Sequence, residues 1–137
     1  MKILVLNSGS SSQKACLYEI GDTLPESPPL PLWEGRIEWS GDAAAIAVRN
    51  SKGIAKKEKL KSLSSERVLK DLLATLWRGE TRSIASAAEI NAVGHRVVHG
   101  GPHFHHPVRI SSEVHTAIGG HVQRIRFSWG HNRPKPE

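Results

Sequence analysis

The N-terminus carries a short apolar run that ends abruptly in a turn of small polar residues. Residues 3–6 are aliphatic, and residues 7–12 consist of one asparagine, one glycine and four serines. A buried strand that enters a tight turn fits this pattern, and residues 14–20 supply a second strand that leaves the turn. The chain is therefore predicted to begin with a β-hairpin.

Two more strands and a helix are expected to follow the hairpin. Residues 32–39 and 44–48 are β-rich, and a turn joins them, so the N-terminal region is predicted to form a four-stranded meander. Ser64 or Ser65 can then cap a helix whose apolar residues recur on one face. Gly79 follows where a helix end needs a positive φ.

The remaining elements complete an α/β pattern. The charge run at residues 56–61 is typical of a solvated strand edge or a loop. Residues 90–99 form another β-rich run. A last short helix is expected to start at Ser111 or Ser112 and to end at residues 119–120. Together these elements predict a mixed five-stranded sheet with helices.

Length and composition restrict the class of protein. A chain of 137 residues with 38% hydrophobic residues can form one domain with a core but not two full-sized ones. No stretch approaches the roughly 18 apolar residues that a membrane span needs. The single cysteine, Cys16, excludes an intrachain disulfide framework and favours a reducing compartment. The first apolar run is too short for a signal peptide, so we expect a cytoplasmic protein.

The net charge of +6 is divided between the body of the chain and its last residues. Residues 121–137 hold four basic and one acidic residue, and the other 120 residues hold 15 basic and 12 acidic ones. This mild excess is typical of a mixed surface with a basic tail, and it argues against binding to nucleic acid. The tail lacks helical or strand periodicity. We therefore predict a domain at residues 1–120 and a separate tail at 121–137.

The turn at residues 7–12, followed by Lys14, can hold a phosphate group. Serine hydroxyls and backbone N–H groups of a tight turn donate hydrogen bonds to an anion, and the lysine adds a positive charge. The spacing differs from that of a Walker A loop. An ordinary hairpin followed by a surface lysine explains the same residues, so both interpretations remain open.

A second candidate site lies on the predicted strand at residues 90–99. Alternate residues of a strand share a face, so Arg96 and Val98 point one way while His95 and His99 point the other. An arginine beside a valine can bind a carboxylate and cover a small apolar substituent. The alternative is a sheet-edge arginine that pairs with a nearby acidic residue.

The two motifs together resemble the acetate kinase family, or acetate and butyrate kinases more broadly, within the superfamily of sugar kinases, actin and heat-shock ATPases. The resembling stretches are residues 2–14, KILVLNSGSSSQK, and residues 93–101, VGHRVVHGG. The resemblance runs to about residue 118 and concerns the N-terminal portion of the family. It implies a ribonuclease-H-like mixed sheet with flanking helices, the first half of an acetate-kinase-like fold.

The resemblance also implies an activity and a set of binding residues. Family members transfer the γ-phosphoryl group of ATP reversibly to acetate, giving acetyl phosphate and ADP, and the family suggests a homodimer. By position, Asn7 would help to hold Mg²⁺, Arg96 would bind the acetate carboxylate, and Val98 would form a wall of the methyl pocket. The residues that would face the ATP phosphates are Ser10, Ser12 and Lys14.

The resemblance implies that part of the active site is missing. Family members continue into a second domain with a histidine, an aspartate, an arginine and a glutamate of the active site, whereas here the pattern breaks near Gly119. No catalytic residue is expected to be retained, and the chain is expected to be inactive alone. Two alternatives stay open: a non-catalytic fragment of a disrupted gene, and a weak basic nucleic-acid binder.

Overall fold

The computed structural model describes residues 1–61, 64–97 and 103–119. The chain forms two units, Met1–Val98 and His99–Glu137. Among the described residues, no helix is long and apolar enough to cross a membrane. In the second unit, residues 112–119 form a helix, and the Ser111 hydroxyl accepts a hydrogen bond from the Val114 N–H (3.3 Å). The sequence predicted this helix.

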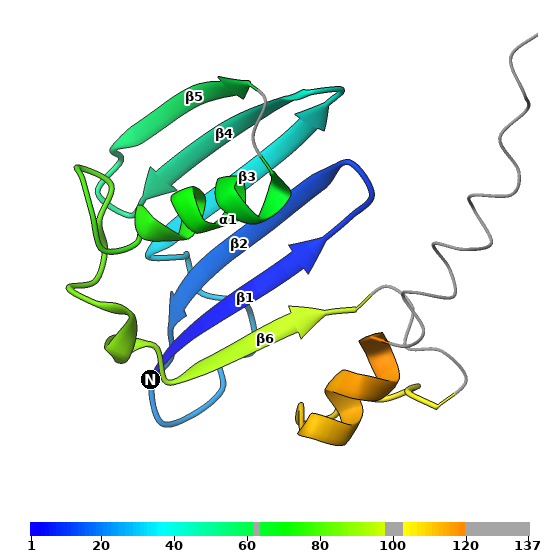
Figure 1. Cartoon of the computed structure of the whole chain (residues 1–137). Helices are drawn as coiled ribbons and strands as arrows, with labels where there is room; N and C mark the ends of the chain where they lie inside the picture. Colours follow the sequence, from blue (N-terminus) through cyan, green and yellow to red (C-terminus); the bar gives the residue numbers. More distant parts are fainter. Residues whose placement is uncertain (62–63, 98–102, 120–137) are drawn as a thin grey trace, which may run out of the picture. The chain divides into compact units, whose positions relative to one another are not determined.

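The first unit is built on one six-stranded sheet with the order β5-β4-β3-β2-β1-β6 (Figure 1). The first five strands are antiparallel neighbours, and β6 pairs with β1 in parallel. The meander is one strand longer than predicted because the charge run forms the edge strand β5. The strands are β1 (Lys2–Ser8), β2 (Ser12–Glu19), β3 (Trp33–Ser40), β4 (Ala43–Asn50), β5 (Ala55–Lys61) and β6 (Ala92–Arg96).

One helix, α1 (Ser65–Ala74), packs against β3 and β4. The Ser64 hydroxyl caps it by accepting a hydrogen bond from the Arg67 N–H (3.3 Å), as the serine pair predicted. Gly79 follows the helix with φ of +75°, a conformation that favours glycine. A short 3₁₀ helix, η1 (Ala87–Glu89), then leads to β6.

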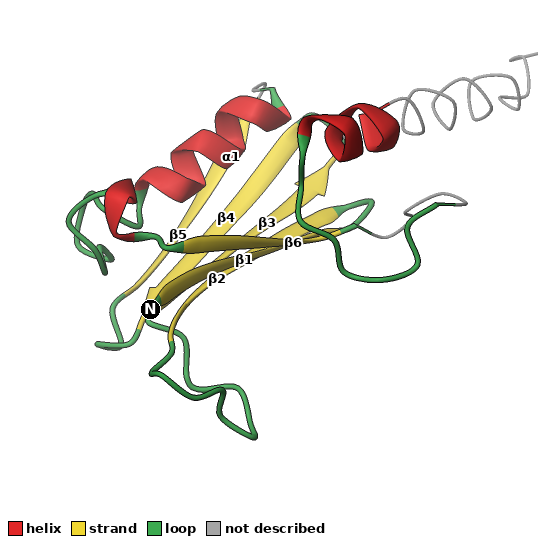
Figure 2. Ribbon diagram, turned by 90° about the horizontal axis from the view of Figure 1, so that it is seen from below, coloured by secondary structure: helices red, strands yellow, loops and turns green. Residues whose placement is uncertain are grey.

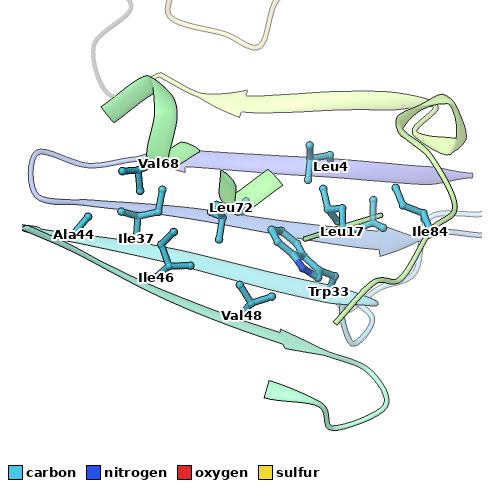
Figure 3. Packing of buried hydrophobic residues seen from close by; sticks show 12 residues of the cluster. Leu4, Leu17, Trp33, Ile37, Ala44, Ile46, Val48, Val68, Leu72 and Ile84 are labelled. Carbon is cyan, nitrogen blue, oxygen red and sulfur yellow. The ribbon is translucent and has the colours of Figure 1, made fainter. Parts of the chain in front are cut away.

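The face of the sheet under α1, here called the covered face, holds the hydrophobic core (Figure 3). Trp33, Ile37 and Leu72 are fully buried there, and the Trp33 indole N–H donates to the Thr75 hydroxyl (3.1 Å). Gly35 lies beneath this contact: a Cβ at this position would lie 2.4 Å from the Trp33 ring and 2.9 Å from Leu72 Cδ1. The close approach of helix to sheet therefore requires a glycine.

The opposite face, here called the open face, has no described helix of the first unit packed on it (Figure 2). Register partners share a face, so one row crosses the sheet from Lys57 through Ala47, Arg36 and Lys14 to Asn7 and Arg96. The β1 residues on this face are Ile3, Val5 and Asn7, and the charged residues on it are Lys14, Glu34, Arg36, Glu38, Arg49, Lys57, Lys59, Lys61 and Arg96.

Three residues fasten the start of β6 to the start of β1. The Lys2 N–H donates to the Asn91 side-chain oxygen (2.6 Å), and the Asn91 N–H donates to the Lys2 carbonyl (2.9 Å). The Lys2 ammonium also pairs with the Glu89 carboxylate (2.9 Å). These contacts help to set the register that aligns the far ends of the two strands.

Candidate functional site

The two motifs singled out in the sequence meet at the carboxyl ends of β1 and β6. Asn7 is the register partner of Lys14 on β2 and of Arg96 on β6. Because register partners share a face, the three side chains form consecutive positions of one row on the open face. Strands that are neighbours in a sheet lie about 4.8 Å apart. The fold thus places one cationic side chain, Lys14 or Arg96, on each side of the Asn7 amide.

Arg96 makes its contact with an amide rather than with an acid. One of its guanidinium N–H groups donates to the Asn7 side-chain oxygen (3.4 Å), and no carboxylate of the described residues forms an ion pair with it. Arg36 and Arg49 on the same face differ, because they pair with Glu38 and Glu34. Among the described residues, Arg96 therefore has a contact with an amide and no acidic partner.

One backbone hydrogen bond within the turn and one from β3 hold the turn between β1 and β2. The Gly9 N–H donates to the Ser12 carbonyl (2.8 Å), and the Trp39 N–H donates to the Ser11 carbonyl (2.9 Å). The Gly9 N–H is therefore used within the turn and is not free for an anion, which corrects one detail of the predicted phosphate turn. Among the described residues, no side-chain hydrogen bond or ion pair engages the Ser10 and Ser12 hydroxyls or the Lys14 ammonium.

A polar group that the sequence analysis did not identify lies on the other side of the same strand end. The Gln13 side-chain N–H donates to the Ser8 hydroxyl (2.8 Å), and this hydroxyl lies 3.5 Å from His95 Nε2. Ser8 and Gln13 are register partners across the hairpin. Pairing the two arms of the predicted hairpin residue by residue could have found the Ser8–Gln13 contact, but nothing local in the sequence indicates His95 beside it.

The electrostatics around Lys14 favour an anion without creating a nucleophile. Burial raises the pKa of the nearby Cys16 thiol, and the hydrogen bond with Tyr18 and the charge of Lys14 only partly oppose this effect. The thiol therefore stays protonated near neutral pH, which makes it a poor nucleophile. Around this turn the chain therefore offers positive charge and hydroxyl donors rather than a nucleophile.

The donor set for a divalent cation is small. Asn7 offers one amide oxygen, and no group of three or more His, Cys, Asp or Glu side chains lies together in the described part of the chain. Mg²⁺ usually keeps several waters and takes few protein ligands when it is bound together with phosphates. A single amide oxygen beside Lys14 fits an ion of that kind and does not fit a cation held by the protein alone. Val98, the predicted partner of Arg96, lies outside the described residues.

Comparison with known proteins gives a consistent picture. The model of the Acetokinase family matches residues 2–136. An acetate kinase from Cyanothece sp. is 51% identical over 120 residues, which are 86% of this chain and 29% of that protein. An acetate kinase from Gloeobacter violaceus is 47% identical over 135 residues, which are 96% of this chain and 32% of that protein.

A solved structure agrees with these relatives. The crystal structure of Porphyromonas gingivalis acetate kinase matches with a TM-score of 0.71 and 30% identity, over 88% of this chain and 29% of that one. The chain thus spans about 30% of the length of the relatives that it matches. The matching regions include the strand, turn and sheet that carry Asn7, Lys14 and Arg96, and the chain belongs to the Acetokinase family.

Proposed function

We propose that this chain is the phosphate- and carboxylate-binding portion of an acetate kinase. The reaction is the reversible transfer of the γ-phosphoryl group of ATP to acetate, which gives acetyl phosphate and ADP. The observation that supports it best is the row Lys14–Asn7–Arg96, in which two cations without an acidic partner among the described residues lie beside a serine-rich turn. Family membership supplies the reaction, and the row supplies residues suited to it.

Transfer between two anions depends on positioning and on charge neutralisation. In this proposal Arg96 binds the acetate carboxylate, and one carboxylate oxygen attacks the γ-phosphorus while the bond to the ADP oxygen breaks. A guanidinium suits this role because its N–H donors match a carboxylate. Val98 covers the methyl group. The residues that bind the ATP phosphates are Ser10, Ser12 and Lys14.

When bound, Mg²⁺ neutralises negative charge on the nucleotide phosphates and orients them. Asn7 would contribute its amide oxygen to that ion, either directly or through a water molecule. The contact of Asn7 with Arg96 (3.4 Å) supports a role for this amide between the residue proposed to bind the carboxylate and the residues proposed to bind the phosphates. Asn7 therefore acts at the junction of the two substrates.

The isolated chain is proposed to lack catalysis, because it spans about 30% of the length of its relatives. Loss of a single transition-state donor commonly costs about 10²–10³ in rate. We expect no acetyl phosphate from the 137-residue chain above the level of an Arg96→Ala control. A family-length protein with these residues is proposed to be a cytoplasmic homodimer.

Binding of Mg²⁺-ADP and of tripolyphosphate to the 137-residue chain tests the phosphate site directly. A charge-assisted hydrogen bond contributes about 1.5–3 kcal/mol, so Lys14→Ala should weaken tripolyphosphate binding about tenfold or more in isothermal titration. Lys52→Ala, at an exposed lysine in the turn after β4, removes the same charge and should leave the affinity unchanged. Equal losses in the two variants would reject the assignment of Lys14.

Activity requires a longer protein, in which residues 1–118 are continued with the remainder of a related acetate kinase. There, Arg96→Ala should raise the KM for acetate and lower kcat, whereas Lys14→Ala should change the kinetics with respect to ATP.

The nucleic-acid alternative makes the opposite prediction for the 137-residue chain. If removal of residues 121–137 abolished a salt-sensitive affinity for DNA or RNA, while Lys14→Ala and Arg96→Ala changed nothing in either protein, the kinase interpretation would fail.

A further inference from the structure

An acidic side chain, that of Glu38, lies beside the turn that is proposed to bind phosphate. Glu38 on β3 is the register partner of Ser12 on β2, and the Cβ atoms of such partners are about 4.5–5.5 Å apart. The next residue, Trp39, donates its N–H to the Ser11 carbonyl (2.9 Å), so β3 is fixed to the turn at this point. A carboxylate in this position repels an anion held by the Ser12 hydroxyl.

A second residue of β3, Arg36, neutralises this carboxylate. The Arg36 guanidinium pairs with the Glu38 carboxylate (2.5 Å), because residues two apart on a strand share a face. Arg36 is also the register partner of Lys14. Like charges directly opposite each other on neighbouring strands are destabilising, and the pairing with Glu38 offsets the repulsion between the two cations. Arg36 therefore balances charge on both sides of the turn.

The Arg36–Glu38 ion pair is poorly placed to stabilise the fold. Its two side chains are 51% and 57% exposed, and exposed ion pairs contribute little to the free energy of unfolding. Loss of either partner, in contrast, leaves one uncompensated charge beside Ser12 and Lys14. The effect of the pair is therefore expected in the affinity for an anion rather than in stability.

The repulsion by Glu38 depends on the charge of the ligand. By Coulomb's law it grows in proportion to the negative charge that approaches the carboxylate. A polyphosphate complexed with Mg²⁺ carries less negative charge than the metal-free polyphosphate. Glu38 therefore disfavours the metal-free form more strongly than the complex.

We propose that the Arg36–Glu38 ion pair selects polyphosphate by its charge. Glu38 disfavours metal-free polyphosphate at the turn, and Arg36 limits this repulsion so that the Mg²⁺ complex still binds. Arg36 is a positioning residue that acts through Glu38 and does not itself hold the phosphate. The inference rests on the proposed function, because it takes Lys14 and the serines of the turn as the residues that bind phosphate.

Isothermal titration of the 137-residue chain with tripolyphosphate tests the pair. Each variant is titrated once in excess Mg²⁺ and once in EDTA. Glu38→Gln should raise the affinity about fivefold in EDTA and about twofold in Mg²⁺. Arg36→Gln should lower the affinity about tenfold in EDTA and about threefold in Mg²⁺. The double variant regains the original net charge, so both affinities should return to within about twofold of those of the original chain.

The ion pair of Glu34 with Arg49 provides a matched control on the same face. Glu34 is the register partner of Cys16, which lies further from the turn than Lys14 does. Glu34→Gln and Arg49→Gln should therefore each change the two affinities less than about twofold. Thermal melting verifies that all variants are folded. If Arg36→Gln does not fold, the comparison of Glu38→Gln with Glu34→Gln in Mg²⁺ and EDTA decides the question alone.

Three results would overturn this inference while Lys14→Ala still weakens binding. They are equal changes in the variants of the two ion pairs, an effect of Glu38→Gln that is the same in Mg²⁺ and in EDTA, and a loss in Arg36→Gln that Glu38→Gln does not reverse. The last result would make Arg36 a direct ligand of the phosphate. If tripolyphosphate does not bind, or binds Lys14→Ala equally well, the proposed function fails and this inference fails with it.

Discussion

The two faces of the sheet have opposite chemistry although the same strands form both. On β3, the residues under α1 include Trp33 and Ile37, which are fully buried, whereas Arg36 between them points to the open face and is exposed. Helix α1 packs on the covered face and shields its apolar side chains from water. The open face carries charged side chains, some of which pair with one another. The buried core and the charged surface are therefore encoded in alternate residues of the same strands.

The largest expected difference between the faces concerns side-chain truncation. Leu72→Ala removes a fully buried side chain beneath α1 and should lower the free energy of unfolding by about 2–5 kcal/mol. Lys57→Ala on the open face should change it by less than about 0.5 kcal/mol. Urea denaturation followed by circular dichroism measures both values. Similar losses in the two variants would contradict the division of roles.

A second comparison uses two strand glycines on opposite faces. Gly35→Ala places a Cβ 2.4 Å from the Trp33 ring, and overpacking of this kind costs about 1–3 kcal/mol. Gly94→Ala places a Cβ where no atom lies within 4 Å, so this variant should be at least as stable as the original chain. Thermal melting would rank them, and a destabilised Gly94→Ala with an unaffected Gly35→Ala would reverse the assignment.

Loss of the N-terminal cap of α1 is expected to have a smaller effect on the free energy of unfolding. Ser64→Ala removes the acceptor of the Arg67 N–H and should cost about 1 kcal/mol. The neighbouring Ser65→Ala removes a hydroxyl that the described structure does not use as a cap, and it should be nearly neutral. Chemical denaturation of this pair isolates the cap from the general effect of losing a serine.

The smallest predicted effect is on pH dependence and concerns the contacts that fasten β6. The backbone N–H of Ala85 and, second, the Lys2 ammonium lower the pKa of Glu89 below its ordinary value of 4.5. This contribution to stability is present above the unfolded-state pKa and is lost as the pH falls through the lowered folded-state pKa. Between pH 6 and 3, Glu89→Gln should therefore flatten the fall in the urea midpoint.

An exposed loop carboxylate serves as the control for this pH experiment. Glu26 forms no ion pair within the described residues, so Glu26→Gln should reproduce the acid dependence of the original chain. A Glu89→Gln profile that matches the profile of Glu26→Gln would show that the contacts of Glu89 with Ala85 and Lys2 contribute nothing measurable to the pH dependence of stability.

Local patterns were sufficient to predict most of the elements. Apolar alternation predicted the strands of the meander, and the serine pair before the stripe of Leu72 predicted α1 and its cap. The charge run at β5 was ambiguous because an edge strand and a loop are both solvated. Only the pairing of residues 55–61 with β4 shows that they form a strand rather than a loop. Such pairing depends on distant residues and cannot be read from the local sequence.

The sequence pointed to the residues of the candidate site but not to their arrangement in space. The turn and the strand at Arg96 were recognised separately, and the family resemblance joined them. That Asn7 lies between Lys14 and Arg96 depends on the parallel register of β1 and β6, which the sequence does not reveal. The concentration of charge on the open face was also missed, because charges counted along the chain give no information about faces.

Strand β6 pairs with β1, although the two strands are far apart in the sequence. Asn7 and Arg96 are 89 residues apart, whereas β1 to β5 form a meander in which each strand pairs with the next one in sequence. Pairing of distant segments must close a long loop and is slower than the formation of a local hairpin. As the chain leaves the ribosome, the serine turn and Lys14 can therefore be in place before Arg96 has been synthesised. The proposed anion site is therefore complete only after β6, the last strand of the sheet, has been synthesised and has paired with β1.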